Sequence, residues 1–224
     1  VTADDRGVLT LVQTLVPVGP AARYAVCSKV SELCATMDAY VDNRVARWNL
    51  TAGGVRRLYD VADFANPVDN FVSAPESISW EDCYWAGNDT RALDWAHASA
   101  VSDGGDHYIV SLRNIDTVLA VGKGDGADAA VAWSLSSRAP AINSTFAFGD
   151  DASMFYNPHD AQVVGVTGDD ALRLMLFDDG NNRPGCETDG FDEEAGCFSR
   201  AVRYALDFDA RVATIEWQFE YATL

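Results

Sequence analysis

Positive charge is scarce in this sequence. The chain of 224 residues has 16 Lys and Arg residues against 34 Asp and Glu residues, which gives a formal net charge of −18 at pH 7. Such a surface repels nucleic acid and anionic lipid, so we expect neither as a partner. It does not exclude bound cations.

Long apolar runs are also missing. The longest run near the start, residues 8–18 (VLTLVQTLVPV), is too short to span a bilayer and contains Gln13. No signal peptide is apparent, and the first residue is Val rather than Met, so we expect a processed or partial product. Apolar residues still make up 48% of the chain, which is enough for a sizeable core.

A clean helical period is absent as well. Only residues 28–42 have a pattern compatible with one short helix. Alternation with a period of two is much stronger, as in TIEWQFE (214–220), where Ile215, Trp217 and Phe219 fall on one face. The sequence therefore predicts an all-β fold.

Strand-like segments recur in two runs of four. The first run comprises residues 94–102, 107–113, 117–121 and 129–135, and the second comprises residues 156–165, 172–177, 200–207 and 213–220. Each run has a His near its start and a Trp near its end, and the second is longer by the length of an insert, residues 178–199.

Such four-stranded antiparallel units are typical of β-propeller blades. Trp48 is expected to end an earlier unit, and Trp48, Trp133 and Trp217 are expected in the blade cores. A propeller has about four to eight blades, so we expect this chain to form a partial ring or one that another polypeptide completes.

The five cysteines form at most two pairs within the chain. Cys186 and Cys197 bracket a polar loop and are expected to form a disulfide. The other three, Cys27, Cys34 and Cys83, cannot all pair with one another, so one is free or bonded to something outside this sequence.

Three N-glycosylation sequons begin at Asn49, Asn88 and Asn143, a mild excess over chance. With the cysteines they favour a secreted protein, extracellular or lumenal.

The insert is rich in acidic residues that could bind calcium, namely Asp189, Asp192, Glu193 and Glu194. Their spacing does not match an EF-hand, so a solvated, disulfide-pinned loop is the favoured interpretation. We therefore expect no cofactor and no metal site.

Five short motifs, in this order, resemble the bacterial-type arylsulfotransferase family, whose members are β-propellers. They are DWAH (94–97), VSLRN (110–114), HDAQ (159–162), FDDGN (177–181) and SRAVRY (199–204). The resemblance extends from about residue 91 to 221. It implies arylsulfotransferase-like blades over residues 91–224, with a disulfide loop at 178–199, after irregular blades or an interface region at 1–90.

The family transfers sulfate from an aryl ester to a phenol, without a nucleotide donor, through a covalent histidine intermediate. The resemblance implies that His159 is the nucleophile, that His97 polarises the sulfate or moves a proton, and that Arg113 and Asn181 contact the substrate. A neutral imidazole is nucleophilic near pH 7. A guanidinium fork matches the charge that spreads over the sulfuryl oxygens. Neighbouring Asp160 is a weaker candidate for orienting the imidazole.

Two positions depart from the family pattern. A further family histidine has no counterpart, because His107 looks like a turn residue. Asp179 stands where the family has Asn, and its charge should weaken binding of an anionic substrate if the side chain faces the site.

Three interpretations remain open. The first is an arylsulfotransferase, and the second is a non-catalytic propeller subunit of an extracellular glycoprotein assembly. The third is a ligand-binding propeller that kept the basic pocket. Taken singly, His97, Arg113 and His159 are also compatible with structural roles. An aryl sulfate and a phenol are the expected ligands of an active enzyme, and a protein partner is expected to complete the ring.

Overall fold

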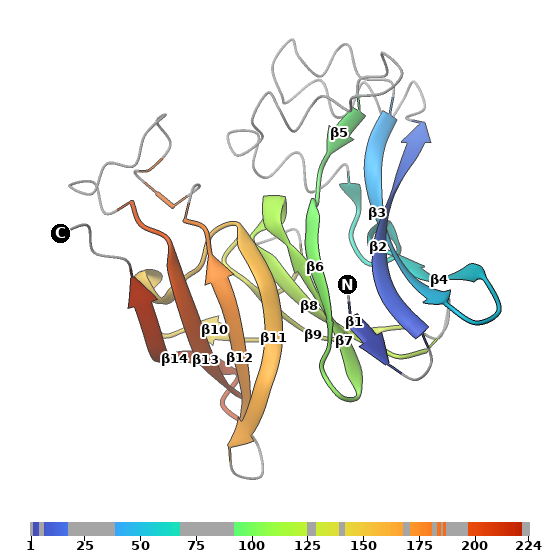
Figure 1. Ribbon diagram of the computed structural model, residues 1–224. Helices are drawn as coiled ribbons and strands as arrows, with labels where there is room; N and C mark the ends of the chain where they lie inside the picture. The colour runs from blue at the N-terminus through green and yellow to red at the C-terminus, as the bar shows by residue number, and fades with distance from the viewer. Residues whose placement is uncertain are drawn as a thin grey trace.

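The chain is all-β, as the sequence predicts. The computed structural model describes residues 2–4, 7–17, 39–67, 92–124, 129–138, 142–167, 171–180, 183–184, 186 and 197–220. Within these residues the elements are strands and short 3-10 helices, and the strands form three sheets that stand side by side (Figure 1).

The first sheet has the strand order β1-β2-β3-β4, with β5 added in parallel to the start of β3. Its strands are β1 (Thr2–Asp4), β2 (Gly7–Pro17), β3 (Ala39–Asn49), β4 (Gly54–Asp60) and β5 (Ala92–Asp94). The short helix η2 (Val61–Asp63) follows β4.

The second sheet is an antiparallel meander in the order β6-β7-β8-β9. Its strands are β6 (Ala98–Asp103), β7 (His107–Leu112), β8 (Thr117–Gly122) and β9 (Val131–Ser136), and η5 (Arg113–Ile115) links β7 to β8.

The third sheet repeats this meander from β11 to β14 and adds a short parallel edge strand, β10. Its strands are β10 (Ala147–Phe148), β11 (Pro158–Thr167), β12 (Ala171–Asp178), β13 (Arg200–Asp207) and β14 (Val212–Glu220), with η7 (Asp151–Ser153) before β11. The two predicted runs of four strands are therefore confirmed.

The expected helix at residues 28–42 is wrong for residues 39–42. They belong to β3, where Val41 pairs with Leu15 and Tyr40 pairs with Val16. These apolar cross-strand pairs satisfy the backbone of β3 in the sheet, which outweighs a weak local helical pattern. Residues 28–38 lie outside the described residues.

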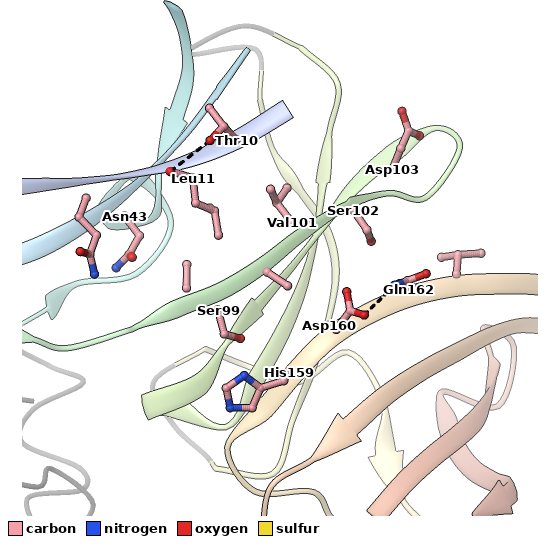
Figure 2. Close-up of a pocket in the computed structure, with 14 residues that line it drawn as sticks. Thr10, Leu11, Asn43, Ser99, Val101, Ser102, Asp103, His159, Asp160 and Gln162 are labelled. Carbon is pink, nitrogen blue, oxygen red and sulfur yellow. Dashed lines mark hydrogen bonds between the residues drawn. The ribbon is translucent and has the colours of Figure 1, made fainter. Parts of the chain in front are cut away.

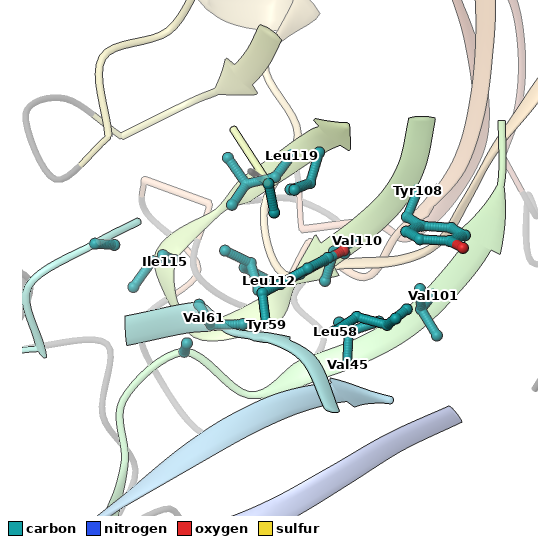
Figure 3. Close-up of a cluster of buried hydrophobic side chains, with 14 of the residues drawn as sticks. Val45, Leu58, Tyr59, Val61, Val101, Tyr108, Val110, Leu112, Ile115 and Leu119 are labelled. Carbon is teal, nitrogen blue, oxygen red and sulfur yellow. The ribbon is translucent and has the colours of Figure 1, made fainter. Parts of the chain in front are cut away.

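The second sheet is covered on both faces because its side chains alternate between its two neighbours. Tyr108, Val110 and Leu119 pack toward the first sheet, in the cluster that Figure 3 shows, whereas Ile109 and Val118 pack toward the third sheet. A strand that is buried on both faces is apolar at nearly every position, as β7 and β8 are. The core of the described chain thus consists of two layers, one on each side of the second sheet.

The expected tryptophan core is partly wrong. Trp133 is buried, as expected, but Trp48 is 48% exposed and Trp217 is 42% exposed. Both exposed rings lie on the outer two of the three sheets: Trp48 is on β3 of the first sheet, and Trp217 is on β14 of the third. The alternation of residues along a strand predicts which side chains share a face. It does not predict whether a further sheet covers that face. Trp95 is almost fully buried, in the cluster between the first and second sheets.

The predicted disulfide between Cys186 and Cys197 is confirmed, with the two Cα atoms 5.4 Å apart. Asn49 and Asn143 are exposed, as glycan acceptors must be. Cys27, Cys34, Cys83, Asn88 and most of the acidic loop lie outside the described residues. Within the described part of the chain, no helix is long and apolar enough to cross a membrane.

Candidate functional site

The first strands of the two four-stranded meanders, β6 and β11, lie next to each other. Ser99 and Ser102 on β6 donate hydrogen bonds from Oγ to the carbonyl oxygens of Pro158 (3.0 Å) and Ala161 (2.7 Å) on β11. From β7, the Oγ of Ser111 accepts a hydrogen bond from the Ala161 amide at 2.9 Å. These bonds fix the register between the two sheets, so the starts of β6 and β11 lie at the same end of the second and third sheets.

His97 is the residue immediately before β6, and its backbone has a left-handed conformation (φ 45°). The carboxylate of Asp94 holds it: Oδ1 accepts a hydrogen bond from the His97 amide at 3.2 Å, and Oδ2 lies 2.8 Å from the ring Nδ1. The Nδ1–Oδ2 contact is short but poorly directed for a hydrogen bond. It is an ion-pair contact when the ring is protonated. A non-glycine residue with positive φ is uncommon and costs about 1–3 kcal/mol, and such strain is concentrated at functional sites.

Arg113 is tied both to His97 and to the start of β11. Its amide donates to the His97 carbonyl at 3.0 Å, which continues the pairing of β6 and β7 by one residue at the open end of their hairpin. Its carbonyl accepts a hydrogen bond from Nδ2 of Asn157 at 3.1 Å, two residues before His159. Asn157 is fully buried with φ 52°, so it is a fixed link between the two sheets.

Arg113 and His159 converge on one carboxylate oxygen. Oδ2 of Asp179 lies 3.8 Å from Nη2 of Arg113 and 3.8 Å from Nε2 of His159. The guanidinium and the imidazole are therefore within twice that distance of each other. All three side chains are partly exposed, at 23% for Arg113, 25% for Asp179 and 35% for His159, so a ligand can reach them.

The turn that carries Asp179 is held tightly. Gly180 has φ 78°, and a Cβ at this position would lie 2.1 Å from the Phe198 carbonyl oxygen, so only glycine fits. The Gly180 amide donates to the Tyr156 carbonyl at 3.0 Å, and the Ser199 hydroxyl donates to the Asp179 carbonyl at 2.7 Å. These contacts dock the turn against the start of β11.

Asp178, beneath this turn, is fully buried in a charged cluster. Its Oδ2 accepts hydrogen bonds from Nη2 of Arg183 at 2.7 Å and from Nε of Arg200 at 2.9 Å, and its Oδ1 accepts one from the Tyr156 amide at 2.8 Å. Burial raises the pKa of Asp178, while the two guanidinium groups and the amide oppose that rise.

Asp116 is a second fully buried anchor, just after η5. Its Oδ1 accepts a hydrogen bond from the Asn157 amide at 2.6 Å, and its Oδ2 lies 2.7 Å from Nη2 of Arg138. Burial raises its pKa to about 6. Asp116 and Asp178 therefore support the two turns from which Arg113 and Asp179 project.

A cavity of about 750 Å³ adjoins the site along the inner strands of all three sheets. Figure 2 shows the His159 ring on its wall, at the β11 side. Much of the remaining lining is polar, with amide, hydroxyl and carboxylate groups from Gln13, Asn43, Ser99 and Asp160. Its volume suits a small organic ligand.

The structure thus brings Arg113 and His159 together and ties His97 to Arg113. His107 begins β7, at the opposite end of that strand from Arg113, so it does not replace the missing histidine. The side chain of Asp160 accepts a hydrogen bond from Gln162 at 2.9 Å, and Asn181 lies outside the described residues. In the described part of the chain, no group of three or more His, Cys, Asp or Glu side chains is arranged to hold a metal ion.

Sequence reasoning missed the residues that hold this site, chiefly Asp94, Asp116, Asn157 and Asp178. One signal was available: each is a short polar residue that borders an apolar strand or opens one of the motifs. Most of their partners are on other sheets or turns, so spacing along the chain does not reveal them; Asp94, three residues before His97, is the exception.

The fold and the site define an all-β protein with four-stranded meanders and a histidine–arginine site where two sheets meet. The family model for arylsulfotransferase (ASST) matches residues 24–223. The chain therefore belongs to the arylsulfotransferase family. No curated protein matched the sequence.

Proposed function

We propose that this protein transfers a sulfuryl group from an aryl sulfate ester to a phenol, with His159 as the nucleophile. The observation that carries the proposal is the convergence of the Arg113 guanidinium and the His159 imidazole on one anionic oxygen. That arrangement suits an anionic group placed between a positive charge and a nucleophile. Family membership supports the same chemistry.

In the first step the lone pair on Nε2 of His159 attacks sulfur, and the bond from sulfur to the aryl oxygen breaks. Arg113 stabilises the negative charge on the equatorial oxygens of the sulfuryl group as it moves. The phenolate that leaves takes a proton, and the proposal assigns this proton to His97, whose carbonyl is bonded to the Arg113 amide.

In the second step the oxygen of an acceptor phenol attacks the sulfur of sulfo-His159. The nitrogen–sulfur bond breaks, its electron pair returns to the imidazole, and the acceptor's proton passes to His97. Asp94, whose carboxylate contacts both the amide and Nδ1 of His97, stabilises the protonated imidazole during this exchange.

The test uses p-nitrophenyl sulfate as the donor and phenol as the acceptor, with release of nitrophenol as the readout. Loss of the nucleophile in His159→Ala should abolish transfer, and Arg113→Lys should lower kcat/KM by about a hundredfold because a forked contact is lost. His107→Ala, a histidine at the other end of β7, should behave as wild type.

Mass spectrometry of the quenched reaction should show one added sulfuryl group on the peptide that contains His159. A folded full-length protein that releases no nitrophenol, and whose His159 gains no sulfuryl group, would refute the proposal.

A second candidate function is a non-catalytic propeller subunit in an extracellular assembly. The outward face of the third sheet favours it, because Phe177 and Phe219 flank Ala201 in one cross-strand row, and Trp217 lies beside them. Phe177 is 42% exposed and Phe219 is 58% exposed. Large adjoining apolar side chains on an open sheet face are typical of an interaction surface.

The partner that fits this face is a further antiparallel sheet with an apolar face, carried by another chain. The same kind of sheet-to-sheet contact already joins the first sheet to the second and the second to the third. Stacking one more sheet on the third would continue that series.

Light scattering of the native protein tests this second candidate. The measured mass should exceed that of one chain, and the double variant Trp217→Glu, Phe219→Glu should reduce it to one chain. Leu50→Glu, which adds one negative charge in the exposed turn after β3, should leave it unchanged. A native protein with the mass of a single chain would rule this candidate out.

A further inference from the structure

We propose that Asp179 determines the ligand affinity and selectivity of this site, because its carboxylate holds the position that a bound anion must take. The inference deepens the proposed function and rests on it for the identity of the anion, an aryl sulfate. It concerns binding, so it is testable apart from sulfuryl transfer.

The geometry places one carboxylate oxygen between the two groups that would hold a sulfate. Oδ2 of Asp179 lies 3.8 Å from both Nη2 of Arg113 and Nε2 of His159. A sulfate oxygen that contacted both groups would occupy the same space. An aryl sulfate therefore binds only when the Asp179 side chain turns away, or binds beside it against the repulsion of a like charge.

The backbone of Asp179 cannot withdraw to make room. Gly180 is confined by the Phe198 carbonyl, the Asp179 carbonyl accepts a hydrogen bond from Ser199, and Asp178 is buried between two arginines. Rotation of the Asp179 side chain is the remaining adjustment. Rotation breaks the contact between the Asp179 carboxylate and Arg113. This contact must be lost before the ligand can make its own contact with Arg113.

The electrostatic effect can be bounded from the distances. A sulfate that kept the Arg113 contact would lie about 4 Å from the carboxylate. At that separation, repulsion between two unit charges weakens binding by about fivefold in a water-like medium and by about a thousandfold in a protein-like one. Because the Asp179 side chain is one-quarter exposed, we expect an effect of about tenfold to a hundredfold.

The negative charge of Asp179 should not weaken the binding of neutral ligands. A phenol carries no charge at pH 7, and its hydroxyl can donate a hydrogen bond to the Asp179 carboxylate. The wild-type site should therefore favour the acceptor over the sulfated donor, and Asp179 should be the residue that sets this preference.

Isothermal titration calorimetry with phenyl sulfate and with phenol provides the test. Asp179→Asn keeps the shape of the side chain and removes its charge, so its Kd for phenyl sulfate should be lower than wild type by about tenfold or more. Its Kd for phenol should be unchanged or higher. Asp179→Ala should also bind phenyl sulfate more tightly, which guards against an effect specific to the amide.

Asp209→Asn is the matched control, because it removes the same charge from the turn between β13 and β14, at the other end of those strands. Its Kd for phenyl sulfate should remain within about twofold of wild type, since exposed charges beyond about 10 Å are screened at ordinary salt.

The outcomes separate the two proposals. Phenyl sulfate that binds Asp179→Asn and Asp179→Ala no more tightly than wild type overturns the inference. Loss of transfer in Asp179→Asn, with unchanged binding, would make Asp179 a proton carrier and overturn it as well. Tighter binding in both variants, with no sulfuryl group ever found on His159, supports the inference and refutes the proposed function.

Discussion

The buried charge of Asp178 should contribute more to folding than any exposed ion pair of the protein. Asp178→Asn keeps the size of the side chain, and its amide oxygen can still accept the hydrogen bond from Tyr156. The substitution removes the negative charge that pairs with Arg183 at 2.7 Å and with Arg200 at 2.9 Å. Arg200 is only 3% exposed, so its charge cannot be hydrated in compensation.

Breaking a buried pair by removing one partner costs about 3–5 kcal/mol, because the other charge stays buried. We expect this loss in the free energy of unfolding. With a urea m-value of about 1–3 kcal/mol per molar, the midpoint should fall by about 1 M or more. Urea titration followed by tryptophan fluorescence measures it.

Asp179→Asn and Asp209→Asn provide the comparison, since both remove an exposed or partly exposed carboxylate and should change stability by less than about 1 kcal/mol. If Asp178→Asn unfolds at the same urea concentration as these two variants, the reasoning from burial is wrong.

Three further changes have expected outcomes. Gly180→Ala should lower the unfolding free energy by about 1–3 kcal/mol, measured in the same urea titration, because the added Cβ would meet the Phe198 carbonyl and φ is 78°. Burial raises the pKa of Asp116 from 3.8 to about 6, so folding takes up a proton between those values. Stability from this group therefore falls as the pH rises from about 4 to 6, and urea midpoints across that range should be less pH-dependent in Asp116→Asn. Replacing Cys186 and Cys197 by Ser should lower the melting temperature, since the disulfide that closes this short loop contributes about 2–3 kcal/mol. Calorimetry should show that reductant lowers the melting temperature of the wild type more than that of the double variant.

Much of the strand pattern could be predicted from the sequence because buried strand positions are occupied by apolar residues. The segments that became β6 to β9 and β11 to β14 are short, apolar or alternating, and bounded by turn residues. Trp133 is buried, as the pattern predicts. Trp48 and Trp217 are exposed, because alternation indicates which side chains share a face but not which face a neighbouring sheet covers.

The candidate site was predictable in part. The motifs identified His97, Arg113 and His159, and the register between β6 and β11 brings their backbones to one end of the second and third sheets. The position of Asp179 was not predictable, since it depends on how the glycine turn after β12 docks against Tyr156 and Phe198 and on the approach of Arg113 from the second sheet. Spacing along the chain also gave no sign that Asp116 and Asp178 hold the two turns, because partners such as Asn157 and Arg200 are distant from them in sequence.

The serine contacts between β6 and β11 have an evolutionary consequence. Ser99, Ser102 and Ser111 bond to main-chain atoms of β11, which every residue type except proline offers. The joint between the sheets thus places no demand on the identity of the side chains at 159 and 162. Those positions are free to diversify, so related proteins can acquire new ligands while the junction that aligns the two sheets stays the same.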